Sequence, residues 1–478
     1  MTSKLPTLPT WAAVAAAVVP AAVVTLLGDM GLLAPAAAAL GTALAFAVTA
    51  LFSRPATEDA DTRMHRFVVI PAALVLSVLA GVIVGGVLDW WFIEPAAYTM
   101  GAAAGAAAGF WLHRGLGTQL ALAFGAVAAA GVLALAATSV VLALSGVAPL
   151  HAFGQMLEFG LQPNSLVIVV NSATTLYLSA VAVAIGFKMK LFNIGVDGQY
   201  RLAALLAAAV GGAWVLPPVV HQVVVILVAV AVGGFWAGIA GYLKVTRGVS
   251  EVISTIMLNA VATGITAYLL NTDRLAVQIS TNNIGTSPIP ESGWVPGIPA
   301  GFMGSDRDIY GLVLLAVAVG VGYWTMLNRT RFGFDLRATG QSPTAALASG
   351  VNIRRMVLLS MVISGMVAGL VGIPQLLGQS HYYALDFPAG LGFTGIAIAL
   401  LGRNHPAGIA FAALFWAFLD QSAQILDFEG IPKEIAVVTQ ATIVLTVVVV
   451  YEVVHRWGLR YQQQQVGREL AREGAEAR

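Results

Sequence analysis

Long apolar runs separated by short polar connections fill the chain from end to end. A helix needs about 20 apolar residues to cross the hydrocarbon core of a bilayer. The candidate spans are residues 11–28, 31–52, 67–88, 95–112, 118–146, 164–186, 202–219, 223–243, 251–270, 309–327, 357–377, 391–402, 406–425 and 435–454. About fourteen such segments predict an all-α fold, a polytopic transmembrane helical bundle. The 391–402 segment is too short to cross alone, so the pattern leaves open whether it crosses or re-enters.

Lys and Arg gather in alternate connections between these spans. The basic positions are Lys4, Arg54, Arg63, Arg66, Arg114, Lys188, Lys190, Lys244, Arg247, Arg403, Arg456, Arg460 and the segment 329–355. Because positive charge stays on the cytoplasmic side, these connections and both termini are predicted to be cytoplasmic. The proline-rich loop 271–308 is then predicted to lie outside. The apolar run after Lys4 could be a signal peptide, but a second run follows without a convincing cleavage site, so a retained span is preferred.

Composition supports a membrane protein. The chain is 58% hydrophobic and 10% charged, whereas soluble domains carry about 25% charged residues. A net charge of +1 without a basic patch gives no reason to expect nucleic-acid binding. The chain has no Cys, which excludes disulfides, thiolate metal sites and a Cys nucleophile.

The character of the apolar segments changes along the chain. Residues 1–112 are rich in Ala and Val, and the glycines of 101–109 share one helix face suited to close packing. Polar residues and glycine elbows accumulate afterwards. We therefore predict additional N-terminal transmembrane segments over 1–117, the working transmembrane domain over 118–458 and a charged cytoplasmic tail over 459–478.

The stretch LFNIGVDGQYR, residues 191–201, places polar residues between two apolar runs. Its polar and flexible positions are Asn193, Gly195, Asp197, Gly198 and Gln199. The glycines allow the chain to bend or unwind, and the polar side chains can cap helix ends or bond to a neighbouring helix. Asp197 can alternatively pair with Arg201 one turn later. A structural elbow is the preferred interpretation, and direct contact with a solute is the alternative.

The segment 331–356 contains signals for a short helix outside the spans. Ser342 and Pro343 form an N-cap and a first helical residue, and Gly350 is a helix stop. Asn352 then caps the helix that enters the next span. Such a short, rigid helix is shaped to be gripped by another protein, and an ordinary capped loop is the alternative.

The segment 244–259 contains a second elbow. Gly248 is expected to end one helix, and Ser250 with Glu251 to begin another. The Glu251 carboxylate then lies where a helix N-terminus favours negative charge. Capping chemistry accounts for this pattern.

No catalytic constellation is visible in the sequence. The seven His residues are scattered, and there is no Walker A pattern and no His/Glu or Ser/His/Asp spacing. We therefore predict no catalytic residue, no metal site and no cofactor bound by this chain.

Several motifs in a fixed order resemble the inner-membrane permease subunits of bacterial ABC importers for nucleosides. That group is related to the ribose and branched-chain amino-acid permeases. The motifs are LFNIGVDGQ (191–199), RGVSEVISTIMLN (247–259), RTRFGFDLRATGQSPTAALASGVNIRR (329–355), SGMVAGLVG (364–372) and GLGFTGIAIALLGRNHPAGI (390–409). The resemblance covers residues 118–455, so it implies a permease core of about ten spans with about four extra N-terminal spans.

The resemblance also implies partners and a location. The permease would lie in the lipid bilayer of the bacterial cytoplasmic (inner) membrane and pair with a second, related permease subunit. A cytoplasmic ABC ATPase would hold ATP and Mg. An extracytoplasmic substrate-binding lipoprotein would deliver a small molecule to loops 271–308 and 378–390.

The resemblance assigns roles to individual residues. The ATPase-coupling loop would comprise Arg337, Pro343, Ala345, Ala346, Gly350 and Asn352. The family elbow motif would comprise Phe192, Asn193, Gly195, Asp197, Gly198 and Gln199, with Gly248 and Glu251 at the second elbow. Many relatives carry Glu at the position of Asp197, so the charge is kept and its reach shortened. Candidates for the substrate path are Asn171, Asn259, Gln375 and Phe393.

The function implied is nucleoside import by alternating access, with ATP hydrolysis by a partner chain. A permease for simple sugars such as ribose is the alternative within transport. An ion-coupled secondary transporter is the alternative of another class, but the predicted span interiors are nearly free of charged residues. Replacing Ala346 by Arg is expected to abolish transport and leave membrane insertion intact.

Overall fold

The computed structural model describes residues 148–428 and a few isolated positions on either side. The chain divides into two units, and the description that follows concerns the unit Val141–Gln440. The predicted N-terminal spans, most of 118–146 and 435–454, and the predicted tail lie outside the described residues, so the count of about fourteen spans does too.

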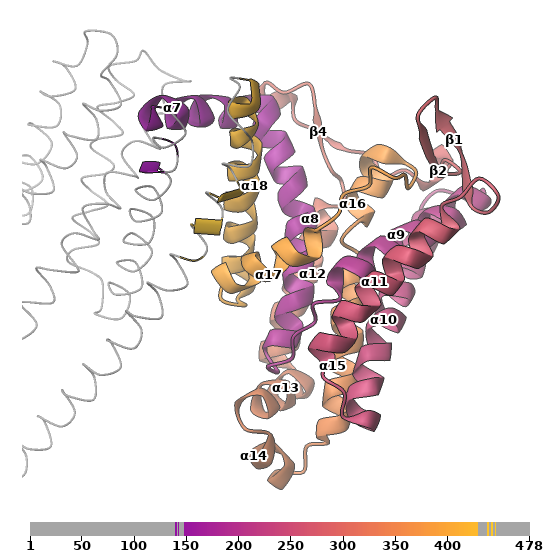
Figure 1. Ribbon diagram of the computed structural model, residues 1–478, viewed down its shortest axis with the longest axis vertical. Coiled ribbons are helices and arrows are strands. Elements are labelled where there is room, and N and C mark those ends of the chain that lie inside the picture. The colour runs from indigo at the N-terminus through magenta and orange to yellow at the C-terminus, as the bar shows by residue number, and fades with distance from the viewer. Residues whose placement is uncertain are drawn as a thin grey trace, which may run out of the picture. The chain divides into compact units, whose positions relative to one another are not determined.

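Helices make up most of the described residues (Figure 1). They are α7 (Pro149–Gly160), α8 (Pro163–Phe187), α9 (Val196–Ala213), α10 (Val220–Arg247), α11 (Glu251–Leu269), α12 (Val313–Arg329), α13 (Arg331–Gln341), α14 (Pro343–Ala348), α15 (Ile353–Gly369), α16 (Ile373–Gln375), α17 (Leu391–Leu401) and α18 (Pro406–Phe428). A π-helical segment, η4 (Leu376–Ser380), continues α16. By length and composition, five described helical segments can cross a membrane: α8, α10, α11, α18 and the run from α15 through η4.

These helices follow the predicted spans closely, with one informative difference. The sequence predicts a span from residue 202, whereas α9 begins at Val196. Asp197 and Arg201 therefore lie inside the helix rather than in the connection before it. The predicted start of this span, at residue 202, was wrong because charged residues usually lie outside a span. In this fold, Asp197 is buried and Arg201 is half-buried against other helices.

The centre of the unit is packed with small residues around α8 and α15. Helix α8 contacts α15, α17 and α18, and its residues Ala180 to Ala184 are fully buried. Helices α10 and α15 approach until their backbones touch, since a Cβ atom added at Gly365 would lie 2.3 Å from the Gly233 carbonyl oxygen. Small residues permit this close approach between membrane helices. The SGMVAGLVG motif is therefore a helix-packing surface.

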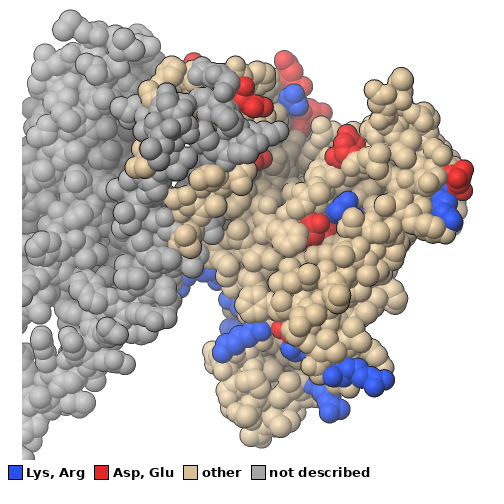
Figure 2. Space-filling view, viewed as in Figure 1, with Lys and Arg blue, Asp and Glu red and all other residues tan. Residues whose placement is uncertain are grey.

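The loop 271–308 folds over one end of the helices. Its strands β1 (Ala276–Ser280) and β2 (Asn283–Thr286) pair antiparallel, and β3 (Ile298–Pro299) pairs with β4 (Asp308–Ile309). The 3₁₀ turns η2 (Glu291–Gly293) and η3 (Gly301–Met303) lie between β2 and β4. At the opposite end, Lys and Arg residues gather around α13 and α14 (Figures 1 and 2).

The short segment predicted at 391–402 is the 11-residue helix α17. It begins at Gly390, where φ is +84°, and ends in a turn in which Arg403 and Asn404 also have positive φ. Helix α18 follows directly and packs against α17. An 11-residue helix spans about 16 Å, which is half a bilayer core, so α17 does not cross by itself.

Candidate functional site

The LFNIGVDGQ stretch forms an unwound segment inserted between helices. The chain turns at Lys190, where φ is +57°, and then runs back beside the last turn of α8. There the Leu191 amide donates to the Gly186 carbonyl at 3.0 Å. A Cβ atom at Gly186 would lie 2.9 Å from the Leu191 carbonyl oxygen, so this return leaves no room for a side chain. The predicted bend before α9 is present.

Two buried amides hold this elbow together. Asn193 and Gln199 exchange hydrogen bonds of 3.0 and 2.9 Å between their side chains. Asn193 also donates to the Ser364 hydroxyl of α15 at 2.8 Å, and Ser364 donates to the Ala182 carbonyl of α8 at 2.6 Å. Buried polar groups left without partners would each cost about 1–3 kcal/mol. The network therefore ties α8, α9 and α15 into one joint.

Asn259 of α11 supplies the partners that the unwound backbone lacks. Its Oδ1 accepts from the Gly198 amide at 2.9 Å, and its Nδ2 donates to the Ile194 carbonyl at 2.9 Å. A Cβ atom at Gly198 would approach Asn259 Oδ1 to 2.8 Å. The glycine is required for this contact, which fixes α11 to the elbow.

Asp197 binds the N-terminus of α17. Its Oδ1 accepts from the Gly390 amide at 2.8 Å and lies 3.4 Å from the Gly392 amide. The Tyr200 hydroxyl, one turn along α9, donates to the Pro388 carbonyl at 2.7 Å. Free amides and the helix dipole both favour a carboxylate at this position. Asp197 thus joins α9 to α17 across 193 residues of sequence.

The alternative pairing of Asp197 with Arg201 is not formed. Among the described residues, the ion pair within 4.0 Å is that of Lys244 with Glu251. The Asp197 carboxylate is held by α17 instead, because backbone amides in the core need an acceptor.

The second elbow touches the first. Gly248 ends α10 in the left-handed conformation, with φ of +69°, as predicted. Glu251 begins α11 and accepts from the Lys244 ammonium, and it also accepts from the Phe192 amide at 3.4 Å. Ser250 is the N-cap residue of α11, as predicted, although its side chain makes no cap hydrogen bond, and Glu251 binds across the elbow.

The segment after α12 forms the short helix that the sequence predicts. Ser342 Oγ accepts from the Ala345 amide at 3.3 Å, Gly350 has φ of +85°, and Asn352 Oδ1 accepts from the Arg355 amide at 3.0 Å. These three helix-end predictions are confirmed. Figure 1 shows α14 projecting past the ends of the long helices.

The two faces of α14 differ. Ala346 is buried, at 3% exposure, whereas Leu347 is 62% exposed and Pro343 and Ala345 are exposed beside it. An Arg side chain at this position would displace packed neighbours, so loss of transport in Ala346→Arg would not by itself show loss of docking. The surface available to a partner includes Pro343, Ala345 and Leu347.

Helix α13 connects α14 to the first elbow. A Cβ atom at Gly340 would lie 2.2 Å from the Lys188 carbonyl oxygen, so the two backbones are in contact. Burial lowers the pKa of the Lys188 ammonium, and the positive charges of Arg337 and Arg403 lower it further. Arg337 also donates to the Gly333 carbonyl of its own helix at 3.3 Å. A displacement of α14 would thus reach the start of the elbow through α13.

The four residues suggested for a substrate path lie on different elements. Asn171 binds strand β4 and its neighbour, donating to the Asp308 carbonyl at 3.0 Å and accepting from the Tyr310 amide at 2.8 Å. Asn259 holds the elbow, and Gln375 precedes the π-helical segment, where its carbonyl accepts from the Ser380 hydroxyl. Phe393 is 53% exposed on α17. The amides of Asn171 and Asn259 are thus occupied by backbone groups.

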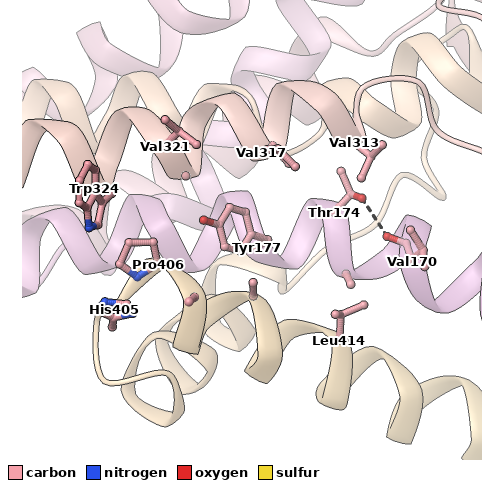
Figure 3. A pocket seen from close by; sticks show the side chains of 15 residues that line it. Val170, Thr174, Tyr177, Val313, Val317, Val321, Trp324, His405, Pro406 and Leu414 are labelled. Atoms are coloured by element: carbon pink, nitrogen blue, oxygen red, sulfur yellow. Dashed lines mark hydrogen bonds between the residues drawn. The ribbon is translucent and has the colours of Figure 1, made fainter.

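An apolar cavity of about 720 Å³ lies between α8, α12 and α18 (Figure 3). Trp324 and His405 line one end and Tyr177 its middle, while the Thr174 hydroxyl points to the Val170 carbonyl. Its lining offers few free hydrogen-bonding groups, so it is poorly suited to a polar solute. Among the described residues, no three His, Asp or Glu side chains gather as a metal site would require.

Comparison with known proteins identifies the family. The profile of the family described as branched-chain amino acid transport system / permease component matches residues 165–451. The guanosine ABC transporter permease protein NupP of Bacillus subtilis is 35% identical over 287 residues, covering 59% of this chain and 81% of that protein. The glucose ABC transporter permease protein TsgB13 of Haloferax volcanii is 32% identical over 340 residues, covering 68% and 87%.

A third relative, the nucleoside ABC transporter permease protein NupB of Lactococcus lactis, is 30% identical over 287 residues, covering 57% of this chain and 76% of that protein. No solved structure matches the chain. The family match spans more than half of the chain, from α8 past α18. The chain is therefore a multi-pass membrane protein that belongs to the branched-chain amino acid transport system / permease component family.

Proposed function

We propose that this chain is the transmembrane permease subunit of an ATP-binding-cassette importer that carries nucleosides across the bacterial cytoplasmic membrane. The family match and the relatives named for guanosine and nucleosides support the proposal. The matched residues, 165–451, fall within the proposed permease domain, 118–458. The observation that carries the proposal is the projecting helix α14, whose exposed side chains suit a docking partner.

The proposed partner at α14 is a cytoplasmic ATPase that binds ATP and Mg. The exposed Leu347 and Ala345 would insert into an apolar depression on it, with the capped ends of α14 keeping the helix rigid. Bacillus subtilis has two guanosine ABC transporter permease proteins, NupP and NupQ, that are 35% and 30% identical to this chain. That pair supports a second, related permease subunit. A binding lipoprotein would meet the loops at the opposite end, and both termini would be cytoplasmic.

The contacts in the core suggest how movement would pass through this chain. When ATP draws the paired ATPases together, α14 would shift and α13 would press on the backbone at Lys188. The elbow network would carry that shift to α9, and Asp197 would move the N-terminus of α17 with it. Joined rigid elements that adopt two arrangements are the usual basis of alternating access.

Sugar import is the second candidate function. The relative named for glucose covers more of this chain than the guanosine and nucleoside permeases, at 32% identity. A sugar and a nucleoside share hydroxyl groups, so the family alone does not choose between them. Ion-coupled import is the alternative of another class.

Competition for uptake tests the substrate. Cells lacking the chromosomal gene would carry the whole transport system on a plasmid, and uptake of radiolabelled guanosine, adenosine and uridine would be measured. We expect saturable nucleoside uptake that unlabelled nucleosides inhibit and a large excess of ribose or glucose leaves unchanged. Uptake of labelled ribose or glucose that nucleosides do not inhibit would reject nucleosides in favour of sugars.

A further inference from the structure

Arg201 is a cation in the second turn of α9, five residues after the first helical residue Val196. Counted at 1.5 Å per residue, it lies about 18 Å from the end of α9 at Ala213. The other Lys and Arg residues in the described long helices lie within a turn or so of a helix end, as in α10, α12 and α15. A cation inside an apolar helix that packs against membrane-spanning helices, as α9 packs against α10 and α11, is costly and in most cases has a function.

The guanidinium has fewer partners than it can bind. Its Nη1 lies 3.5 Å from the Thr263 hydroxyl, at the limit of a hydrogen bond, and the guanidinium is also paired with the Tyr383 hydroxyl and attracted by the Asp197 carboxylate. Its Nε is buried and has no hydrogen-bond partner. No carboxylate of the described residues lies within ion-pair distance, because Asp197 is held by α17. Since arginine carries five N–H donors, several remain available.

This side chain lies at an accessible place in the unit. Helix α9 contacts both α11 and α17, and Arg201 itself is half-buried. Next to it on α11, Thr263 and Gly264 are exposed, and a Cβ atom at Gly264 would meet nothing within 4 Å. A solute in contact with this part of α9 and α11 would meet the exposed part of the Arg201 guanidinium.

We propose that Arg201 contacts the transported substrate and selects 6-oxopurine nucleosides by donating to O6 and N7 of the base. This inference rests on the proposed nucleoside import. The planar guanidinium presents two parallel donors, which fit the adjacent O6 and N7 acceptors of guanine. A sugar hydroxyl presents no such pair of acceptors. Arg201 is thus a specificity-determining residue within the importer.

The test compares guanosine with 7-deazaguanosine, in which N7 is replaced by C–H. Uptake of radiolabelled guanosine by the complete transport system would be measured with each compound as competitor. The measured quantity is the ratio of the two half-inhibitory concentrations, 7-deazaguanosine over guanosine. The chain would be wild type, Arg201→Lys or Arg201→Gln. The matched control is Arg274→Lys, because Arg274 lies in the loop after α11 and stacks on Tyr268 at the end of that helix. The same binding protein serves every variant, so its own preference cancels between them.

We expect Arg201→Lys to lower this ratio about tenfold relative to wild type, since a bidentate pair discriminates bases by about one order of magnitude. Arg274→Lys should leave it unchanged. An unchanged ratio in both Arg201 variants would overturn the inference while nucleoside import stands. A wild-type system that imports no nucleoside would reject the proposed function and this inference with it.

A second measurement tests binding directly, so that variants without measurable uptake can also be compared. The purified complete transporter would be photolabelled with 8-azidoguanosine, and labelling of this chain would be quantified. We expect labelling that guanosine protects against and that falls about tenfold in Arg201→Gln. Equal labelling of the wild-type and Arg201→Gln chains would overturn the inference.

Discussion

Replacing Leu347 by Arg is expected to reduce nucleoside uptake by more than about tenfold, because an apolar contact at the centre of an interface contributes about 2 kcal/mol or more. Leu347 is 62% exposed on α14, so the larger side chain does not disturb the packing of this chain. The guanidinium would instead be buried without a partner against the ATPase, which is costly. Uptake and co-purification of the ATPase with the tagged permease would both be measured.

Two matched variants accompany this prediction. Leu347→Met keeps the apolar surface and should retain uptake and the bound ATPase. Phe302→Arg places the same charge on an exposed aromatic position, 77% exposed, in the loop at the other end of the molecule. It should retain the ATPase. A Leu347→Arg chain that retains both ATPase and uptake would remove α14 from the proposed docking surface.

Replacing Gly365 by Leu is expected to destabilise the protein by at least about 3 kcal/mol, because the added atoms cannot be accommodated. A Cβ atom there would lie 2.3 Å from both the Gly233 carbonyl oxygen and the Ala237 side chain. Helices α10 and α15 would have to separate, and the Ser364 hydroxyl bound to Asn193 would move with α15. The loss would appear as a lower melting temperature in detergent and as rapid proteolysis in membranes.

The matched control is Gly322→Leu in α12. A Cβ atom at Gly322 meets nothing within 4 Å, so the same substitution should cost little and can gain helix propensity. Equal melting temperatures for Gly365→Leu and the wild type would contradict the close α10–α15 contact.

Features that depend on residues close together in the chain could be predicted from the sequence. Apolar runs located the described spans, because twenty apolar residues in a row leave few other folds. The ends of α14 and α15 followed from Ser342, Gly350 and Asn352, whose side chains or backbone act within three residues. Gly248 was recognised for the same reason.

Features that join distant segments could not be predicted in this way. Asp197 accepts a hydrogen bond from the Gly390 amide at the start of α17, 193 residues further along the chain. The periodicity of apolar residues does not show which distant segments meet. Asn193 meets Ser364 across 171 residues. Arg201 was placed outside the span because charge marks most helix ends, and only the packed structure shows it inside α9.

The docking surface of α14 required the structure as well. The sequence of the helix, PTAALA, contains three similar small residues, and composition does not show which one points inward. Packing against its neighbours buries Ala346 and leaves Leu347 exposed. The helix was therefore predicted correctly, whereas its exposed side chains follow only from the packed structure.

The central claim is that ATP hydrolysis by a partner bound at α14 drives nucleoside uptake. Inside-out vesicles or proteoliposomes containing the complete transporter would be loaded with the nucleoside and its binding protein on the outer-face side, and transport would be timed with and without ATP. The account predicts transport that requires ATP, persists when ionophores collapse the proton and sodium gradients, and is lost in Leu347→Arg. Transport that proceeds without ATP and stops when an ion gradient is collapsed would contradict it.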